Sequence, residues 1–410
     1  MFRRVNFYSI CFAFGLSVLL ILAGSRYTDN TNYRPMSESR RNIKNFFKVD
    51  DGEDTESQPV PTNSYDGTPN IEKILEKTRA KIQFELWNYN FTYSGVKKLD
   101  DLIIETGGRP LRSIIISSWR SGSTFLGEVI NAIPGTYYHY EPFLNYGIIQ
   151  IRGSPLAETV LNSIKDMLKC NFEEMDDFLD YGRGHNHQFS HNTRLWDHCK
   201  YKKELCFDSD FMSKFCKLFP FQSMKVVRLR LRLVQELLED KELNAKVVFL
   251  IRDPRGVLQS RLHRDFCHPS PDCSNPELLC ADMISDYVAA SRLLKLYPDK
   301  LMVLRYEDLA LNLNSTTHKL LKFLRLSHMQ AVDEYLNSHT NTEVSGVSST
   351  FRVSREVPFR WKNILDFEYA DQIQMACKEA MNLWGYRMAH NATHMTSKEF
   401  DPLETYTITQ

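Results

Sequence analysis

The chain has 410 residues, and its 51 lysines and arginines balance its 51 aspartates and glutamates. A nucleic-acid-binding protein normally carries an excess of basic residues, so the composition argues against nucleic acid as a partner. The length allows one large domain or two ordinary ones.

The N-terminus is typical of a membrane signal anchor. Residues 7–24 form a largely apolar, uncharged run that is just long enough to span a bilayer. Arg3 and Arg4 precede it and favour a cytosolic N-terminus, although Arg26 on the far side weakens this bias. The small residues at 22–25 would suit cleavage of a signal peptide instead, but the run is long for one.

The chain therefore divides into four predicted parts. A cytoplasmic tail covers residues 1–6 and a transmembrane signal anchor covers residues 7–24. Residues 25–70 are polar and charged with several prolines, which indicates a flexible stem. Residues 71–410 would then form a lumenal domain, as in a single-pass type II membrane protein.

Strand and helix patterns alternate along the predicted domain. A plausible amphipathic helix over Ile71–Leu86 leads into it. Further along, the expected strands are Ile114–Ser117, Lys225–Leu229, Val247–Ile251 and Leu301–Arg305, and the expected helices are Phe125–Ile133, Leu233–Leu238, Ala281–Leu296, Thr316–Leu324 and Tyr369–Leu383. This alternation predicts an α/β fold with a parallel sheet flanked by helices, in which ligands bind at the carboxyl ends of the strands.

A turn of small residues, Ser117 to Thr124, joins the first strand to its helix. Its backbone N–H groups can converge on one point, and the helix N-terminus adds partial positive charge, so phosphate is the expected ligand. A kinase or GTPase would place Gly-Lys-Ser/Thr here with the hydroxyl on magnesium, whereas this P-loop-like turn has Gly122-Ser123-Thr124. Arg120 is its only cation, and we expect the turn to hold an anionic group without a metal.

A second segment has the same predicted order of strand, turn and helix as the first. Lys246 to Ile251 is expected to be a buried strand, and a polar turn, Arg252 to Gly256, follows it before a helix from Val257 to Leu262. Arg252 at the strand end and Ser260 about two helical turns later could hold a second phosphate. Asp253 is expected to hold the turn by accepting hydrogen bonds from backbone N–H groups.

These two segments resemble those of Golgi carbohydrate sulfotransferases, in particular the galactose/N-acetylglucosamine/N-acetylgalactosamine 6-O branch. Trp119–Phe125 resembles the family's loop for the 5′-phosphosulfate of 3′-phosphoadenosine 5′-phosphosulfate (PAPS), and Arg252–Ser260 resembles its 3′-phosphate segment. The similarity covers roughly residues 110–390 and includes His139–Pro142, Met224–Leu229, Leu304–Leu309, Ser349–Arg352, Trp361–Lys362, Cys377 and Gly385–Tyr386. Several motifs in the expected order are a more specific signal than any one of them.

The resemblance implies a function and a set of binding residues. It implies transfer of a sulfuryl group from PAPS, without a metal, to the 6-hydroxyl of a sugar in a glycan such as keratan or chondroitin. The acceptor glycan would belong to a glycoprotein or proteoglycan, the enzyme would lie in the Golgi membrane, and it could form a homodimer. The implied PAPS-binding residues are Trp119, Arg120, Ser121, Gly122, Ser123, Thr124, Phe125, Arg252, Asp253, Pro254, Arg255, Gly256, Val257, Leu258, Gln259 and Ser260.

Sulfuryl transfer needs a base, positive charge and an in-line arrangement of donor and acceptor. Glu141 is the predicted base, because its place after the phosphate loop resembles that of the basic glutamate of tyrosylprotein sulfotransferases. His139 is its rival, because side chains alternate along an extended segment and would place both residues on one face. Arg120 is expected to bind the donor's 5′-phosphosulfate. Lys225, at the start of its expected strand, would neutralise the bridging oxygen, with Arg228 as a second candidate.

Each catalytic assignment has a structural alternative. Glu141 could be a salt-bridged structural glutamate, and Lys225 could be a solvated lysine at a strand edge. Tyr306 to Asp308 are expected to brace the site, and Ser349, Thr350 and Arg352 could close over the nucleotide.

A histidine-rich segment has two interpretations. His185, His187, His191 and His198 lie near Asp197 and could bind a metal. The alternative is a polar surface loop that faces the acceptor sugar.

The cysteines and sequons fit a lumenal domain. Apart from Cys11 in the predicted span, the cysteines are Cys170, Cys199, Cys206, Cys216, Cys267, Cys273, Cys280 and Cys377. This even number favours disulfides, whose connectivity stays open. Zinc is the alternative, but the spacings lack the close pairs typical of zinc sites. Glycosylation sequons begin at Asn90, Asn314 and Asn391.

Other functions use the same motifs differently. A phosphotransferase is disfavoured, because neither a Gly-Lys-Ser/Thr loop nor an evident magnesium carboxylate is present in the sequence. Sulfation of protein tyrosines and a catalytically inactive lumenal protein that binds glycan or nucleotide are the remaining alternatives. The joint presence of Arg120, Glu141, Lys225, Arg252 and Ser260 argues against the inactive protein.

Overall fold

A computed structural model describes residues 70–200, 202–340 and 355–408. The predicted tail, anchor and nearly all of the stem lie outside the described residues, as does the segment Ser349–Arg352 that was expected to close over the nucleotide. Within the described ranges, no helix has both the length and the apolar character needed to cross a membrane.

A parallel sheet of five strands forms the centre of the domain, which confirms the predicted α/β class. The strands are β1 (Leu111–Ile116), β2 (Thr136–Tyr140), β3 (Phe221–Val226), β4 (Lys246–Ile251) and β5 (Leu301–Arg305), in the spatial order β2-β3-β1-β4-β5. Nearly all residues of β1, β3 and β4 are buried, as expected for strands that are covered on both faces.

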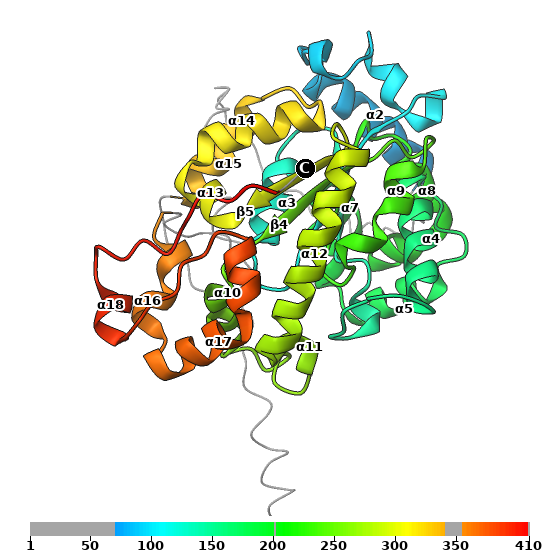
Figure 1. Ribbon diagram of the computed structural model, residues 1–410. Coiled ribbons are helices and arrows are strands. Elements are labelled where there is room, and N and C mark those ends of the chain that lie inside the picture. Colours follow the sequence, from blue (N-terminus) through cyan, green and yellow to red (C-terminus); the bar gives the residue numbers. More distant parts are fainter. Residues whose placement is uncertain (1–69, 201, 341–354, 409–410) are drawn as a thin grey trace, which may run out of the picture. The chain divides into compact units, whose positions relative to one another are not determined.

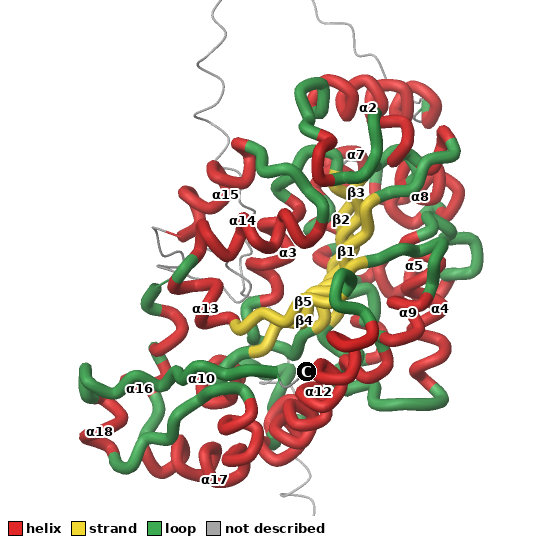
Figure 2. The backbone as a smooth tube through the Cα atoms, turned by 45° about the horizontal axis from the view of Figure 1, so that its top comes forward, coloured by secondary structure: helices red, strands yellow, loops and turns green. Residues whose placement is uncertain are grey.

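Helices cover both faces of the sheet. Their bounds are α2 (Ile71–Glu85), α3 (Ser123–Asn131), α4 (Leu156–Leu168), α5 (Asp176–Gly184), α6 (His187–Ser190), α7 (Thr193–Cys199), α8 (Ser209–Cys216), α9 (Gln235–Glu239), α10 (Pro254–Arg261), α11 (Pro271–Ser274), α12 (Pro276–Leu296), α13 (Tyr306–Leu311), α14 (Leu313–Leu324), α15 (Gln330–Thr340), α16 (Trp361–Ile364), α17 (Phe367–Leu383) and α18 (Ala392–Thr396). Figure 1 shows α12 in front of β4 and β5. Figure 2 shows α3, α14 and α15 on one side of the strands and α4, α5, α9 and α12 on the other.

The position of β3 corrects the sequence analysis. The strand Lys225–Leu229 was expected, but β3 runs from Phe221 to Val226. Its first half contains the polar residues Gln222 and Ser223, which do not match an apolar pattern although both are buried in the sheet. Lys225 therefore lies at the carboxyl end of its strand rather than at the start, which brings it to the edge where ligands bind.

The strand order creates a crevice between β1 and β4. The chain leaves β1 through α3 toward β2 at one edge of the sheet, and it leaves β4 through α12 toward β5 at the other edge. Where neighbouring strands lead in opposite directions, the loops after them separate and leave room for a ligand. The two predicted phosphate segments are these two loops.

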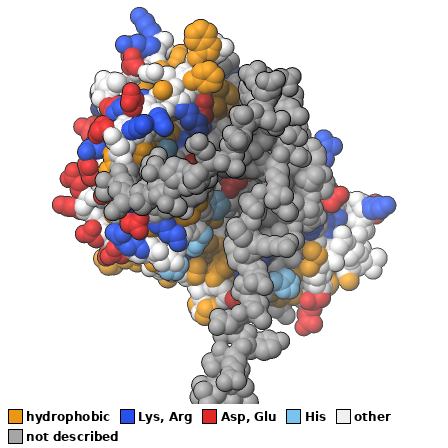
Figure 3. Space-filling model, turned by 180° about the vertical axis from the view of Figure 1, so that it is seen from behind, with side chains coloured by type: hydrophobic (Ala, Val, Ile, Leu, Met, Phe, Trp, Pro, Cys, Tyr) orange, Lys and Arg blue, Asp and Glu red, His pale blue; other side chains and the backbone are white. Residues whose placement is uncertain are grey.

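Charged side chains are mixed on the surface. Over the coloured part of the face in Figure 3, lysine and arginine alternate with aspartate and glutamate, and no single basic surface is formed there. This distribution agrees with the balanced net charge of the chain.

The eight cysteines of the domain form four disulfides, which confirms the prediction of disulfides and supplies their connectivity. The pairs are Cys170–Cys216, Cys199–Cys206, Cys267–Cys273 and Cys280–Cys377. Zinc was the alternative for two clusters, Cys199/Cys206/Cys216 and Cys267/Cys273/Cys280, and all six of these cysteines are used in the disulfides. The bond Cys280–Cys377 joins α12 to α17 and closes the longest loop of the four.

Loss of the α12–α17 disulfide should destabilise the domain more than loss of a short-range one. Cys280 and Cys377 are 97 positions apart, whereas Cys199 and Cys206 are 7 apart. A cross-link restricts the unfolded chain more when its loop is longer, so Cys280→Ser with Cys377→Ser should lower the free energy of unfolding by about 2–5 kcal/mol. Denaturant unfolding of both double variants measures this, and an equal or larger loss for the 199/206 variant would contradict it.

Candidate active site

A cavity of about 630 Å³ lies at the carboxyl ends of the strands. Its lining residues are Trp119, Arg120, Gly122, Ser123, Thr124, Phe125, Tyr140, Glu141, Leu144, Gly147, Ile148, Tyr181, His187, Lys225, Val227, Arg228, Arg252, Gln259, Ser260, Arg264, Phe266, Tyr306, Leu309, Ala310, Val357, Arg360 and Ile364. The size suits a ligand larger than a single sugar.

The loop after β1 has the backbone geometry of an anion cradle. Arg120 and Gly122 both adopt a positive φ, of 68° and 90°, and α3 begins at Ser123 directly after them. A Cβ on Gly122 would lie 2.4 Å from the ring of Tyr306, so only glycine fits this turn. Ser123 and Thr124, in the first turn of α3, line the cavity, where the helix N-terminus favours negative charge.

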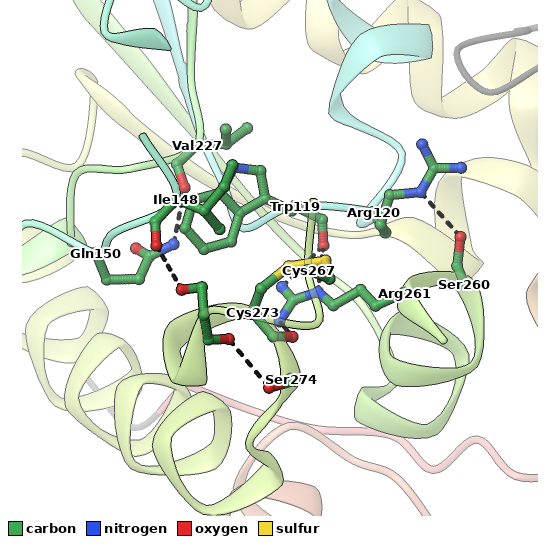
Figure 4. The surroundings of a disulfide bond; sticks show 11 residues. Trp119, Arg120, Ile148, Gln150, Val227, Ser260, Arg261, Cys267, Cys273 and Ser274 are labelled. Carbon is green, nitrogen blue, oxygen red and sulfur yellow. Dashed lines mark hydrogen bonds between the residues drawn. A yellow bond between two sulfur atoms is a disulfide. The ribbon is translucent and has the colours of Figure 1, made fainter. Parts of the chain in front are cut away.

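The two predicted phosphate segments meet in this cavity. The Arg120 Nε donates a hydrogen bond to the Ser260 Oγ at 3.0 Å (Figure 4). The Arg252 Nη1 donates to the backbone oxygen of Arg120 at 2.8 Å, and its guanidinium lies 4.7 Å from the centre of the Tyr306 ring. The Arg252 Nε is buried and has no hydrogen-bond partner among the described residues. The arginines and the serine therefore form one connected cationic group, which could hold an anion.

The predicted binding residues divide into two sets. Trp119, Arg120, Gly122, Ser123, Thr124, Phe125, Arg252, Gln259 and Ser260 line the cavity, whereas Ser121, Asp253, Pro254, Arg255, Gly256, Val257 and Leu258 do not. The buried Arg255 instead pairs with Asp253 at 2.7 Å and donates to Gln374 at 2.9 Å. Asp253 accepts from the Arg255 backbone N–H at 2.9 Å, which confirms its expected role in the turn.

Glu141, Lys225 and Arg228 form a buried ion cluster where β2 and β3 end. The Glu141 carboxylate lies 2.6 Å from the Lys225 Nζ and 3.0 Å from the Arg228 Nη1. Lys225 is 1% exposed, donates to the Thr124 Oγ1 at 2.9 Å and lies 4.0 Å from the centre of the Tyr140 ring. The alternative of a solvated Lys225 is therefore wrong.

The contacts in this cluster shift the pKa values of Glu141 and Lys225. Burial would raise the pKa of Glu141, but Lys225 and Arg228 outweigh it and lower the pKa to about 2. Burial would likewise lower the pKa of Lys225, but Glu141 outweighs it and raises the pKa above the usual lysine value. Without a ligand, Glu141 is thus a carboxylate and Lys225 is an ammonium.

His139 does not share the position of Glu141. The backbone turns at Glu141, where φ is 40°, so the expected alternation along one extended segment fails and the prediction of a shared face is wrong. His139 is 6% exposed, packs against Tyr137 and Phe172, and does not line the cavity. Burial lowers the pKa of His139 to about 3.

Of residues 306–308, which were expected to brace the site, Tyr306 and Glu307 contact the second loop. The Glu307 carboxylate accepts from the Asp253 N–H and the Tyr386 hydroxyl, both at 3.0 Å. Burial raises the pKa of Glu307 to about 7. Asp308 pairs with Arg305 at 2.9 Å, while Tyr306 also lines the cavity.

The histidines of the predicted metal cluster have separate partners. His191 contacts Glu128 at 3.1 Å, and His185 stacks on Tyr181 with 3.9 Å between ring centres. In the part of the chain that the structure describes, no three His, Cys, Asp or Glu side chains are grouped as metal ligands. His187 lines the cavity together with Tyr181, but the segment is formed by α5, α6 and α7 rather than by the expected surface loop.

Sequence reasoning missed several residues that line the cavity. Tyr140, Ile148, Arg264, Phe266 and Arg360 line it, and none of them was singled out. They come from loops and short elements that are far apart along the chain, so no local pattern joins them. The one sequence feature that could have indicated some of these lining residues is the position of Arg264 and Phe266 shortly after Ser260.

Comparisons with known proteins agree with the motifs. The sulfotransferase domain family model matches residues 110–385. Carbohydrate sulfotransferase 4 of Mus musculus is 26% identical over 345 residues, which cover 73% of this chain and 88% of that protein. Carbohydrate sulfotransferase 3 of Mus musculus is 24% identical over 335 residues, which cover 71% of each.

Among solved structures, the sulfotransferase domain from the curacin biosynthetic pathway is similar, with 14% identity and a TM-score of 0.39 over 66% of this chain and 97% of that chain. The family model covers more than half of the sequence, and it spans both phosphate segments and the ion cluster. The chain therefore belongs to the sulfotransferase domain family and is a PAPS-dependent sulfotransferase related to the carbohydrate sulfotransferases.

Proposed function

We propose that the enzyme transfers a sulfuryl group from PAPS to the 6-hydroxyl of galactose, N-acetylglucosamine or N-acetylgalactosamine in a glycan of a glycoprotein or proteoglycan. The observation that carries this proposal is the joint placement of the Arg120–Ser260–Arg252 group and the Glu141–Lys225 pair in one cavity. The relatives named carbohydrate sulfotransferases support a sugar as the acceptor.

The residues present fit the donor. The cradle at Gly122, the α3 N-terminus and Arg120 would hold the 5′-phosphosulfate. Arg252 and Ser260 would hold the 3′-phosphate, and the unpartnered buried Nε of Arg252 is the observation that fits an anionic ligand there. These residues supply backbone N–H groups, hydroxyls and guanidinium groups, so the binding mode needs no metal.

The ion cluster supplies the base and the cation of the reaction. The acceptor hydroxyl oxygen forms a bond to sulfur, and its proton passes to the Glu141 carboxylate. The bond between sulfur and the bridging oxygen breaks, and its electron pair stays on the 5′-phosphate of the product 3′-phosphoadenosine 5′-phosphate. Lys225 stabilises the charge that develops on this oxygen.

The depressed pKa of Glu141 sets a condition for this mechanism. A carboxylate with a pKa of about 2 is a weak base as long as both cations contact it. When Lys225 turns its ammonium toward the bridging oxygen, Glu141 loses its closest cation and its pKa rises. This movement of Lys225 from Glu141 to the donor, which we call the exchange, would couple the binding of the donor to the activation of the base.

The proposed cellular location is based on the N-terminal sequence. Residues 7–24, behind Arg3 and Arg4, would anchor the enzyme in the Golgi membrane as a single-pass type II protein. The four disulfides of the domain support a lumenal catalytic domain.

Transfer of labelled sulfate tests the reaction. With radiolabelled PAPS in EDTA, we expect label on at least one member of a panel of desulfated glycans, at the 6-hydroxyl by product analysis. A tyrosine peptide serves as the comparison acceptor. Label on the peptide alone would contradict the proposal, and activity that disappears with the chelator would contradict the metal-free mechanism.

Substitution of the base should separate chemistry from binding. Glu141→Gln keeps the shape of the side chain and removes the proton acceptor, so turnover should fall by about 10²–10⁴-fold while nucleotide binding persists. Steady-state rates and calorimetry with 3′-phosphoadenosine 5′-phosphate measure the two effects.

The control is Glu128→Gln, which removes a carboxylate that contacts His191 instead of Lys225 and Arg228, and this variant should retain activity. Because Glu141→Gln leaves two buried cations without their partner, thermal melting must first show a folded protein. Loss of both nucleotide binding and turnover in the folded Glu141→Gln variant would assign Glu141 a structural role.

The second loop should recognise the 3′-phosphate. Arg252→Ala or Ser260→Ala should weaken binding of 3′-phosphoadenosine 5′-phosphate by roughly 1.5–3 kcal/mol, because each removes a charge-assisted contact. Calorimetry compares this ligand with adenosine 5′-phosphate, which lacks the 3′-phosphate. Equal losses of affinity for both ligands would show that these residues do not bind the 3′-phosphate.

A further inference from the structure

The end of α2 exposes two large aromatic side chains. Phe84 is 83% exposed and Trp87 is 80% exposed, although α2 buries Leu75 and Ile82 on its other face. The two aromatic residues are three positions apart, so they are neighbours on the surface of the helix end and form one aromatic patch. Single exposed hydrophobic residues are common, but two adjacent aromatic rings in water are unfavourable and indicate that a ligand or partner covers them.

A glycosylation sequon begins directly after this aromatic patch. It consists of Asn90, Phe91 and Thr92. Asn90 is exposed, and its side-chain oxygen accepts hydrogen bonds from the N–H and the hydroxyl of Thr92. Both bonds use the oxygen, so neither of them occupies the amide nitrogen to which a glycan would be attached.

The turn that joins the aromatic patch to the sequon is fixed to the domain. The Tyr89 N–H donates to the Leu86 oxygen at 3.0 Å. Tyr89 is 6% exposed, its ring lies 5.1 Å from that of Phe221 in β3, and its hydroxyl accepts from the Ser327 N–H at 2.9 Å. Neighbouring side chains on an extended backbone point in opposite directions, so Asn90 points outward beside the buried Tyr89.

Trp87 and Asn90 are therefore close to each other and both face solvent. Three residues span at most about 11 Å, and Asn88 between them is also exposed. The asparagine side chain and the first sugar ring of a glycan together bridge a gap of this size. A sugar attached to Asn90 is tethered next to Trp87, so its effective concentration at the aromatic patch exceeds that of a free ligand.

The other two sequons lack this arrangement. Asn314 lies in the first turn of α14, and Asn391 caps α18, where its side chain accepts from the His394 N–H at 2.8 Å. Among the described residues, no exposed large hydrophobic side chain lies near either asparagine in the sequence. The combination of an aromatic patch and a sequon in one turn is thus a feature of Asn90.

We propose that Asn90 carries an N-linked glycan whose first N-acetylglucosamine covers Trp87 and Phe84. The Asn90 Nδ2 forms a bond to the anomeric carbon of this sugar and loses a proton. The bond from that carbon to the diphosphate of a lipid-linked oligosaccharide donor breaks, and its electron pair stays on the phosphate. The apolar face of the sugar ring packs on the indole, while the hydroxyls stay in water. This inference rests on the lumenal location in the proposed function.

Peptide mass spectrometry tests the attachment. The full-length chain is produced in cells with a secretory pathway, purified in detergent and treated with an amidase that removes N-glycans and converts the asparagine that carried them to aspartate. We expect this conversion at Asn90 in most molecules. Glycan on Asn314 or Asn391 with an unmodified Asn90 would overturn the inference and leave the lumenal location intact. Absence of glycan from all three asparagines would overturn both.

Quenching of tryptophan fluorescence by acrylamide tests whether the sugar covers the ring. Three of the five tryptophans are at most 5% exposed, namely Trp119, Trp361 and Trp384. With the glycan trimmed to its first sugar, Asn90→Gln should increase quenching relative to wild type, but not when Trp87→Phe is also present. Asn314→Gln is the matched control and should leave quenching unchanged. Equal quenching with and without Asn90→Gln would overturn the inference.

The glycan should stabilise the domain without affecting catalysis. Asn90→Gln should lower Tm by about 1–3 °C, and by less when Trp87→Ala has already removed the ring that the sugar contacts. Phe84, Trp87 and Asn90 do not line the cavity, and Figures 1 and 2 show α2 far from α10, so sulfate transfer should stay at the wild-type rate. Equal losses of Tm in both backgrounds, or loss of transfer in folded Asn90→Gln, would overturn the inference.

Discussion

The buried cluster of Glu141, Lys225 and Arg228 is the constraint on which the rest of the site depends. Burying an unpaired charge is unfavourable by several kcal/mol, so the three groups are tolerated only together and only in close contact. Their contact requires β2 and β3 to lie side by side, with Lys225 opposite Tyr140 and directly beside the turn at Glu141. The pairing of two strands thus fixes the distance between the proposed base and the proposed cation.

The crevice between β1 and β4 joins this cluster to the donor loops. Lys225 reaches Thr124 in the first turn of α3, so the ion cluster and the anion cradle are in direct contact. Across the crevice, Arg252 donates to the Arg120 backbone and links the two loops. Local composition predicted both loops, because a small-residue turn and an arginine at a strand end are visible in short stretches of sequence. The sheet then places them side by side.

Features that depend on distant contacts could not be predicted in the same way. The start of β3 was missed, because Gln222 and Ser223 are polar yet buried, and only the neighbouring strands explain why. His139 and Glu141 were alternative candidates for the base because a straight extended backbone would place both side chains on one face. The positive φ of Glu141 interrupts that backbone. The position of the loop between α10 and the disulfide Cys267–Cys273 depends on disulfide connectivity, which the count of cysteines leaves open.

One interaction has two roles that oppose each other in this site. The contact between Glu141 and Lys225 stabilises both buried charges, yet it also weakens the carboxylate as a base. In the proposed mechanism, a donor with a negatively charged bridging region would compete for the lysine and would release the carboxylate only when the donor is in place. The structure keeps these charges paired, and in the proposed mechanism the same lysine that restrains the base would stabilise the leaving group. Arg228 contacts Glu141 and the Gly147 oxygen, and these contacts would hold the carboxylate in position during the proposed exchange.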